Sequence, residues 1–244
     1  MIAPELYVFS GATRLAHAAA ETVIETLRAA LTQRGRASFV LTGGSTPIPL
    51  YRLLAADYRG ALDWERVDFF FGDERHVPHD DDDSNVRMAR ETLLDGLHLS
   101  PDRVHPIPTS GTPEADARSY ERTLRAYFDG ALPAFDLMLL GMGADGHVAS
   151  LFPGSPALDE AERWVVATES PPSSPVRDRV TLTFPALNAS RTVLFLVAGA
   201  SKHEALAAVH RDPSDAPPAE RVEAQDRLLW FVDEDAAGDL KRTN

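Results

Sequence analysis

The chain has 244 residues, no cysteine and a formal charge of −13 at pH 7. The absence of cysteine excludes disulfides, thiolate catalysis and cysteine-ligated metal sites. The acidic balance argues against nucleic acid or an anionic membrane as the main partner. No apolar run is long enough to cross a membrane, and the first residues lack the pattern of a secretory signal. We therefore expect a cytoplasmic protein with one domain, residues 1–244.

Short apolar runs alternate with longer amphipathic stretches, which is the pattern of strands alternating with helices. In chain order we expect a strand at 5–10, a helix at 12–33, a strand at 37–44, a helix at 45–56, a strand at 66–75, helices at 84–97 and 113–128, strands at 135–143, 163–170, 178–184 and 191–199, a helix at 201–210, a strand at 227–233 and a helix at 234–240. Surface loops are expected at 170–178 and 211–220.

Most of the expected strands are nearly continuous apolar runs, as in parallel sheets that are buried on both faces. The sequence therefore predicts an α/β fold with a doubly wound, largely parallel sheet and helices on both faces. This is a Rossmann-like three-layer sandwich.

Ligands of open α/β sheets bind beyond the carboxyl ends of the strands. Four of the expected strands end there in residues capable of binding or chemistry. These residues are Gly43, Gly44, Ser45 and Thr46 at the end of the second strand, Asp73, Glu74 and Arg75 at the end of the third, Asp145 and His147 after the fourth, and Lys202 after the strand at 191–199. The sequence therefore predicts a binding or catalytic site at this edge of the sheet.

The stretch "GMGADGH" at 141–147 satisfies the dinucleotide pattern GxGxxG. That pattern must open a crossover helix, but Pro153, Gly154 and Pro156 would end any helix within about two turns. The other interpretation is a glycine turn that exposes Asp145 and His147 as an acid-base pair, because imidazole exchanges protons readily near neutral pH. A turn whose histidine only bonds the backbone stays open as an alternative.

The stretch "TGGSTP" at 42–47 combines small residues with an expected helix start, which is typical of a phosphate cradle. The alternative is a simple strand-to-helix turn, in which Ser45 or Thr46 caps the helix and Pro47 lies in its first turn.

The acidic stretch "GDERHVPHDDDDSN" at 72–85 raises the possibility of a metal site with His76 and His79. Four consecutive aspartates cannot all turn toward one ion, and the spacing matches no EF-hand or zincin pattern. A solvated acidic loop before a helix capped by Ser84 is the favoured interpretation. A covalent serine mechanism has little support, because the sequence has no GxSxG elbow and Ser150 follows His147.

Together, "LTGGSTP", "FFGDERHVPHDDDDSN", "FDLMLLGMGADGHVASLFPG", "DRVTLTF" and "AGASK" resemble the 6-phosphogluconolactonase family, over about residues 37 to 235. The resemblance implies a fold shared with glucosamine-6-phosphate isomerase/deaminase. It also implies hydrolysis of 6-phospho-D-glucono-1,5-lactone in the pentose phosphate pathway, without a cofactor or metal. The only partner it implies is a small sugar phosphate, and it does not fix the oligomeric state.

The resemblance also implies roles for individual residues. His147 would activate water as general base and could then protonate the ring oxygen as it leaves. Asp145 would orient the site or bind substrate hydroxyls, and Arg75 would stabilise the oxyanion or bind the phosphate. Asp73 would belong to the same catalytic set. The implied phosphate site consists of Gly43, Gly44, Ser45, Thr46, Arg179 and Lys202.

Two alternatives share this fold. The deaminases that the chain resembles have a catalytic glutamate five residues after the histidine, where this chain has Phe152. The missing acid favours the lactonase. The second alternative is a non-catalytic sugar-phosphate sensor, although no basic DNA-binding segment precedes residue 5.

Overall fold

The computed structural model describes residues 2–209 and 216–240. Its main sheet has six parallel strands in the order β1-β9-β8-β5-β2-β3. These strands are β1 (Glu5–Phe9), β2 (Ala37–Leu41), β3 (Val67–Phe71), β5 (Leu137–Leu140), β8 (Thr192–Val197) and β9 (Arg227–Asp233). Every residue of β2, β3, β5 and β8 is buried. The predicted parallel sheet of continuous apolar strands is therefore confirmed.

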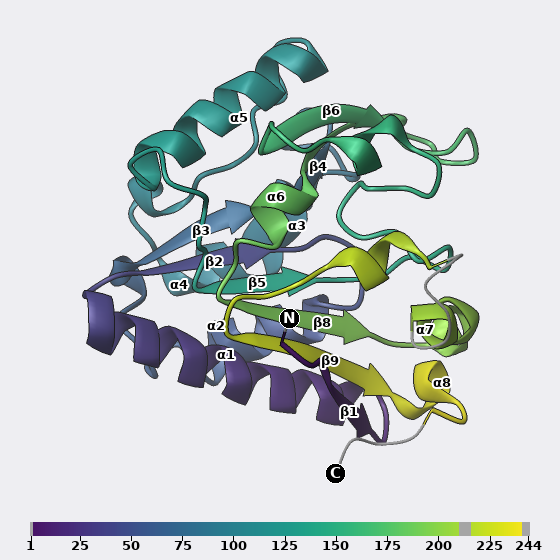
Figure 1. Cartoon of the computed structure of the whole chain (residues 1–244). Helices are drawn as coiled ribbons and strands as arrows, with labels where there is room; N and C mark the ends of the chain where they lie inside the picture. The colour runs from purple at the N-terminus through teal and green to yellow at the C-terminus, as the bar shows by residue number, and fades with distance from the viewer. Residues whose placement is uncertain (1, 210–215, 241–244) are drawn as a thin grey trace.

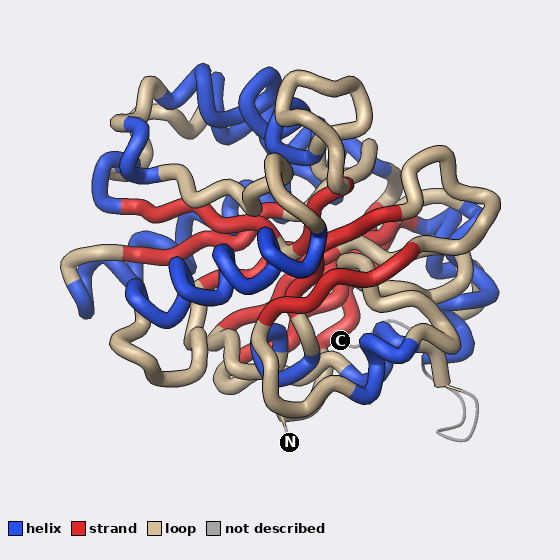
Figure 2. The backbone as a smooth tube through the Cα atoms, turned by 90° about the horizontal axis from the view of Figure 1, so that it is seen from above, coloured by secondary structure: helices blue, strands red, loops and turns tan. Residues whose placement is uncertain are grey.

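Helices cover both faces of this sheet, with α1 and α2 on one side and α5 and α6 on the other (Figure 1). Seen from above, the strands cross the middle of the molecule with helices around them (Figure 2). The helices are α1 (Ala12–Arg34), α2 (Ile48–Ala56), α3 (Asn85–Ala89), α4 (Asp95–Leu97), α5 (Pro113–Tyr127), α6 (Phe184–Leu187), α7 (His203–Val209) and α8 (Glu234–Ala237). The doubly wound three-layer α/β fold is therefore confirmed.

A second sheet, which the sequence analysis does not predict, has three antiparallel strands in the order β4-β7-β6. These strands are β4 (Asp73–Arg75), β6 (Val165–Glu169) and β7 (Asp178–Leu182). The single strand expected at 66–75 is wrong, because the chain leaves the first sheet at Gly72. The N–H of Gly72 donates to the Leu41 carbonyl at 3.1 Å, and its carbonyl accepts from the N–H of Leu182 at 2.9 Å. Gly72 therefore joins the two sheets.

Two helix starts differ in their caps. The expected cap by Ser45 or Thr46 is wrong, because α2 begins at Ile48 without a side-chain cap. The expected cap by Ser84 is confirmed, since its hydroxyl accepts from the N–H of Arg87 at 3.2 Å. The segment expected as one helix at 84–97 is divided into α3, a π-helical turn (Arg90–Leu94) and α4.

Short 3₁₀ turns complete the described secondary structure. They are Trp64–Arg66, Pro101–Arg103, Pro156–Asp159, Ala200–Lys202 and Pro218–Arg221. The helix expected at 201–210 thus starts as a 3₁₀ turn before α7, and its last residue, His210, lies outside the described residues. Residues 211–215 of the loop expected at 211–220 lie outside them as well.

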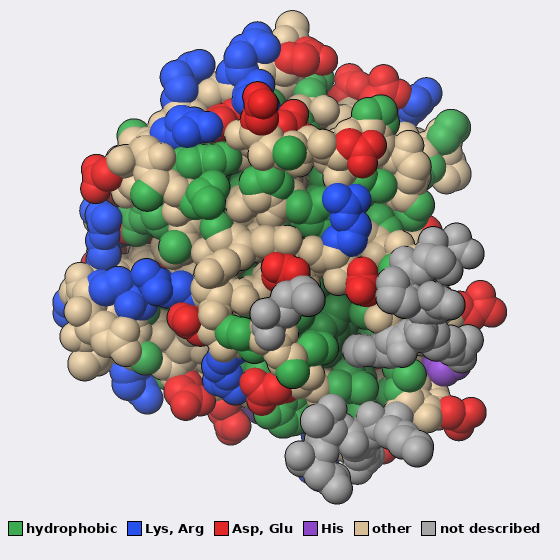
Figure 3. Space-filling model, in the orientation of Figure 1, with side chains coloured by type: hydrophobic (Ala, Val, Ile, Leu, Met, Phe, Trp, Pro, Cys, Tyr) green, Lys and Arg blue, Asp and Glu red, His purple; other side chains and the backbone are tan. Residues whose placement is uncertain are grey.

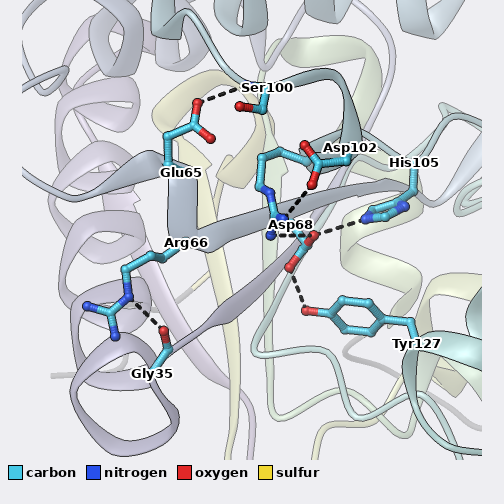
Figure 4. A network of polar contacts seen from close by, with 9 residues as sticks. Gly35, Glu65, Arg66, Asp68, Ser100, Asp102, His105 and Tyr127 are labelled. Carbon is cyan, nitrogen blue, oxygen red and sulfur yellow. Dashed lines mark hydrogen bonds and ion pairs between the residues drawn. The ribbon is translucent and has the colours of Figure 1, made fainter.

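A polar network connects the edge strand β3 to the neighbouring segments of the chain (Figure 4). Asp68 is only 4% exposed and accepts a hydrogen bond from the Tyr127 hydroxyl at 3.0 Å. The other partners of its carboxylate are His105 Nε2 at 3.0 Å and Arg103 Nη1 at 3.4 Å. One buried carboxylate therefore joins β3 to the end of α5 and to the segment that follows Pro101–Arg103.

Asp68→Ala is expected to lower the free energy of unfolding by roughly 1–3 kcal/mol, because it removes a buried carboxylate that pairs with three half-buried polar side chains. Urea denaturation followed by circular dichroism measures this. Glu65→Ala is the matched control, since the exposed Glu65 carboxylate only accepts from the N–H of Ser100 at 2.8 Å (Figure 4). Equal losses in the two variants would contradict a stabilising role for the network.

Candidate active site

The strand order places a topological switch between the neighbouring strands β2 and β5. From β2 the chain continues outward to β3, whereas from β5 it continues in the other direction to β8. Such a switch opens a crevice beyond the carboxyl ends of the two strands. A cavity of about 750 Å³ lies there, between segments that follow β2, β5 and β8 and the second sheet. It is lined by the residues predicted for the site except Glu74, namely Gly43, Gly44, Ser45, Thr46, Asp73, Arg75, Asp145, His147, Arg179 and Lys202. Glu74 is completely buried and does not line the cavity.

The turn after β5 holds Asp145 and His147 against each other. Asp145 Oδ1 lies 2.6 Å from His147 Nδ1 and also accepts from the N–H of His147 at 3.2 Å. With Nδ1 engaged, Nε2 is the ring nitrogen left to exchange a proton with water or substrate. The His147 ring therefore pairs with a carboxylate. The alternative interpretation, a turn whose histidine bonds only the backbone, is wrong. No crossover helix follows the turn, because the next described helical element is the 3₁₀ turn Pro156–Asp159.

The charge state of Asp145 follows from this pairing. Burial raises the pKa of Asp145, but the hydrogen bond and charge of His147 outweigh burial and hold the pKa below its usual value. A carboxyl group with a lowered pKa stabilises the fold above its unfolded pKa of about 3.9 and loses that contribution as the pH falls through the lower folded value. Asp145 is therefore a carboxylate throughout the neutral range.

Gly143 has no Cβ atom, and this makes room for the side chains of Asp145 and His147. Its N–H donates to the His147 carbonyl at 2.9 Å, which closes the turn. A Cβ atom on Gly143 would lie 2.1 Å from His147 Nδ1 and 2.4 Å from Asp145 Oδ1. Both distances are far below van der Waals contact, so any side chain at this position must push the pair aside.

Gly143→Ala is therefore expected to lower kcat by about 10²-fold while both members of the pair are still present, because small displacements of reacting groups have effects of this size. Steady-state turnover of the candidate substrate measures it. Gly60→Ala is the control, since a Cβ at Gly60 meets nothing within 4 Å. If Gly143→Ala turns over the substrate as fast as the control, the turn adapts to the new methyl group. The space beside Gly143 is then not required for catalysis.

The second sheet places charged side chains on the opposite wall. Arg75 on β4 is directly opposite Arg179 on β7, and Asp73 is opposite Thr181. Alternate residues of a strand share a face, so Asp73, Arg75 and Arg179 point to the same side, where they line the cavity. Like charges placed directly opposite each other are unfavourable. Two neighbouring guanidinium groups are therefore suited to binding an anion between them.

Burial lowers the pKa of Arg179; the Asp73 carboxylate partly offsets this, and the Arg75 guanidinium adds to it. Each of these charged groups is held in place by a hydrogen bond. Ser150 Oγ donates to Asp73 Oδ2 at 2.7 Å, Arg75 Nη1 donates to the Asp83 carbonyl at 2.6 Å, and Arg179 Nη2 donates to Ser174 Oγ at 3.0 Å. The wall is therefore preorganised.

The segment after β2 forms the third wall. Gly44 has a φ of +85°, a left-handed conformation that favours glycine. Ser45 and Thr46 precede α2 without capping it, and both line the cavity. Lys202 reaches the cavity from the 3₁₀ turn after β8. We call Gly43, Gly44, Ser45 and Thr46 the cradle.

Some cavity residues are missed by the sequence analysis. The loop between β6 and β7, expected only as a surface loop, contributes Ser170, Pro171, Ser173 and Ser174 to the lining. Asn85 also lines the cavity. Asn85 directly follows the Ser84 cap and closes the stretch 72–85, which contains the charged residues of a strand end. This position is a signal that could have identified Asn85.

The histidines of the acidic stretch have protein partners. His76 Nε2 lies 2.9 Å from Asp116 Oδ2, and His79 Nε2 lies 2.8 Å from the Ile107 carbonyl. Among residues 2–209 and 216–240, no group of three or more metal-ligating side chains is arranged to hold an ion.

Within the same ranges, no helix is long and apolar enough to cross a membrane. Acidic and basic side chains are interspersed over the described part of the face in Figure 3.

Comparisons with known proteins identify the family to which the chain belongs. The family model described as glucosamine-6-phosphate isomerases/6-phosphogluconolactonase matches residues 10–230. The 6-phosphogluconolactonase of Synechocystis sp. is 41% identical, over 98% of this chain and 100% of the relative. That of Mycobacterium tuberculosis is 42% identical, over 96% and 97%. The solved 6-phosphogluconolactonase from Trypanosoma cruzi superposes with a TM-score of 0.88 at 32% identity, over 98% and 97%. The chain therefore belongs to the glucosamine-6-phosphate isomerase/6-phosphogluconolactonase family.

Proposed function

We propose that this chain hydrolyses 6-phospho-D-glucono-1,5-lactone to 6-phospho-D-gluconate, with His147 as the general base. The relatives of about 40% identity support the enzyme class, a lactone-hydrolysing carboxylic ester hydrolase. The observation that carries the mechanism is the 2.6 Å contact between Asp145 and His147 in a cavity that also contains Arg75, Arg179 and Lys202.

The reaction needs one proton acceptor that later becomes a proton donor. His147 Nε2 removes a proton from water as the water oxygen attacks the lactone carbonyl carbon. Asp145 holds Nδ1–H and stabilises the imidazolium that forms. When the tetrahedral intermediate collapses, the bond between the carbonyl carbon and the ring oxygen breaks. The imidazolium then returns its proton to that oxygen, so the histidine is restored and a water molecule has been consumed.

The remaining charged groups bind and orient the substrate. The cradle supplies backbone N–H groups and hydroxyls to the 6-phosphate, and Arg179 and Lys202 supply positive charge. Asp73 accepts hydrogen bonds from sugar hydroxyls and orients the ring. Arg75, opposite Arg179 in the sheet, reaches either the same phosphate or the developing oxyanion. A KM effect of its removal indicates the phosphate, and a kcat effect indicates the oxyanion.

One preparation assayed on fresh 6-phosphogluconolactone and on glucosamine 6-phosphate tests the proposal. We expect lactone hydrolysis well above the spontaneous rate and no release of ammonia. The absence of deamination is expected because Phe152, whose ring centroid lies 4.5 Å from that of His147, occupies the sequence position of the deaminase glutamate. Ammonia release would support a deaminase, and ligand binding with lactone loss at the spontaneous rate would support a sensor.

A further inference from the structure

Asn85 lies between the cradle and the cavity wall that contains Asp73. It is the first residue of α3, is 2% exposed and lines the cavity. Its backbone N–H donates to Glu74 Oε1 at 2.7 Å, and the neighbouring N–H of Val86 donates to Glu74 Oε2 at 2.9 Å. Glu74 itself is completely buried. The backbone of Asn85 is therefore fixed to strand β4 by a carboxylate that does not face the substrate.

The side-chain amide of Asn85 contacts Asp73. Nδ2 donates to the Asp73 backbone carbonyl at 3.0 Å and approaches the carboxylate Oδ1 at 3.4 Å. Both partners are acceptors, so the amide nitrogen must face Asp73 and the amide oxygen must face away. This fixes the orientation of the whole amide group.

On its other side the same amide packs against Gly43 of the cradle. A Cβ atom on Gly43 would lie 2.0 Å from Asn85 Oδ1 and 2.5 Å from Cγ, so only glycine fits here without displacement. Asn85 Oδ1 is buried, and within the described part of the chain it has no hydrogen-bond partner. An unpaired buried oxygen is unfavourable for stability. Its presence between two walls of the cavity indicates a requirement of the site rather than of the fold.

We propose that Asn85 is a positioning residue that fixes the spacing between the phosphate cradle and Asp73. It acts through Gly43 on the phosphate and through Asp73 on the sugar ring. The inference rests on the proposed function, because the two walls act on one substrate only if that substrate is a sugar phosphate. Asn85 is thus part of what holds the lactone carbonyl at His147.

Two substitutions separate the two contacts. Asn85→Ala removes both, and we expect kcat/KM to fall at least about tenfold, with weaker inhibition by inorganic phosphate. Asn85→Leu has nearly the same shape and keeps the packing against Gly43 but donates no hydrogen bond to Asp73. It is expected to keep phosphate inhibition near that of the wild type and to lower kcat.

Asn188→Ala is the matched control. The side chain of Asn188 also makes two hydrogen bonds, donating to the Arg221 carbonyl at 3.0 Å and accepting from the N–H of Glu223 at 3.0 Å, but Asn188 does not line the cavity. The control is expected to change the melting temperature and not the kinetic constants. If Asn85→Ala behaves like the control, Asn85 is only structural and the inference is wrong.

A double-mutant cycle with Gly43→Ala tests the contact itself. In the wild-type background the new methyl group collides with Asn85, so kcat/KM should fall steeply. In the Asn85→Ala background the space is free, and the same substitution should have a much smaller effect. Equal effects in both backgrounds would overturn the inference. If Asn85→Ala does not fold, Asn85→Ser also frees this space and replaces it in the cycle.

The failure of the proposed function would look different. In that case the wild-type chain would not accelerate lactone hydrolysis at all. The affinity for inorganic phosphate, measured by calorimetry across the same four proteins, would still show whether Asn85 and Gly43 act together. Additive effects on that affinity would overturn the positioning role of Asn85, whatever reaction the chain catalyses.

Discussion

Replacing His147 with alanine is expected to lower kcat for 6-phosphogluconolactone by about 10² to 10⁴, the usual contribution of a positioned general base. The fold should be unaffected, because the His147 side chain is 31% exposed and its carboxylate partner Asp145 is 42% exposed, on the same turn. A coupled assay that follows 6-phosphogluconate formation, corrected for spontaneous hydrolysis, measures the effect. Thermal melting of the same samples checks the fold.

His17→Ala is the control for this experiment, since His17 is an exposed histidine on α1. It should retain wild-type turnover. Turnover of His147→Ala within a factor of about two of the wild type would remove His147 from its proposed role, because a general base contributes far more than this.

Replacing Arg179 with alanine is expected to raise KM by about 10²-fold or more, as is usual when one partner of a buried charge pair is removed. Arg179 is 8% exposed and its Nη2 also donates to the Val176 carbonyl at 3.0 Å, so the guanidinium is already ordered before a phosphate binds. Lys202→Ala should change KM in the same direction. Steady-state kinetics measure both effects.

The phosphate-free glucono-1,5-lactone distinguishes phosphate binding from other roles of Arg179. Its hydrolysis should be equally slow in the wild type and in Arg179→Ala, because the missing contact has no partner on that substrate. Arg177→Ala is the control, since Arg177 is an exposed residue that pairs with Glu169 outside the cavity. A loss confined to kcat on the phosphorylated lactone would contradict the placement of Arg179 at the phosphate.

The main sheet could be predicted because its strands carry a strong local signal. Buried parallel strands such as "FDLMLL" are continuous apolar runs, and the residues that follow them mark the edge of the sheet that carries the candidate site. The second sheet has no comparable signal. Its pairing joins Asp73 to Thr181 across more than a hundred residues of sequence. Such a pairing depends on the fold as a whole and leaves no local signal. In the sequence, the charged residues after Gly72 are therefore indistinguishable from the end of the strand that precedes them.

The same reasoning explains which parts of the site could be predicted. Asp145, His147 and the cradle follow strand ends, so their chemistry and position could be inferred together. Arg179 was identified only through the family resemblance, since nothing in "DRVTLTF" points to a cavity. The role that we propose for Asn85 could not be predicted from the sequence, because it depends on contacts with Gly43 and Asp73, which belong to two other segments.

A crystal structure of the wild-type chain with 6-phosphogluconate bound tests the central arrangement most directly. We expect the phosphate to lie on the cradle between Arg179 and Lys202. The carboxylate formed from the lactone should then lie about 3 Å from His147 Nε2, within hydrogen-bond reach of the proposed base. A product bound in the opposite direction, or a His147 ring turned away from that carboxylate, would contradict the account.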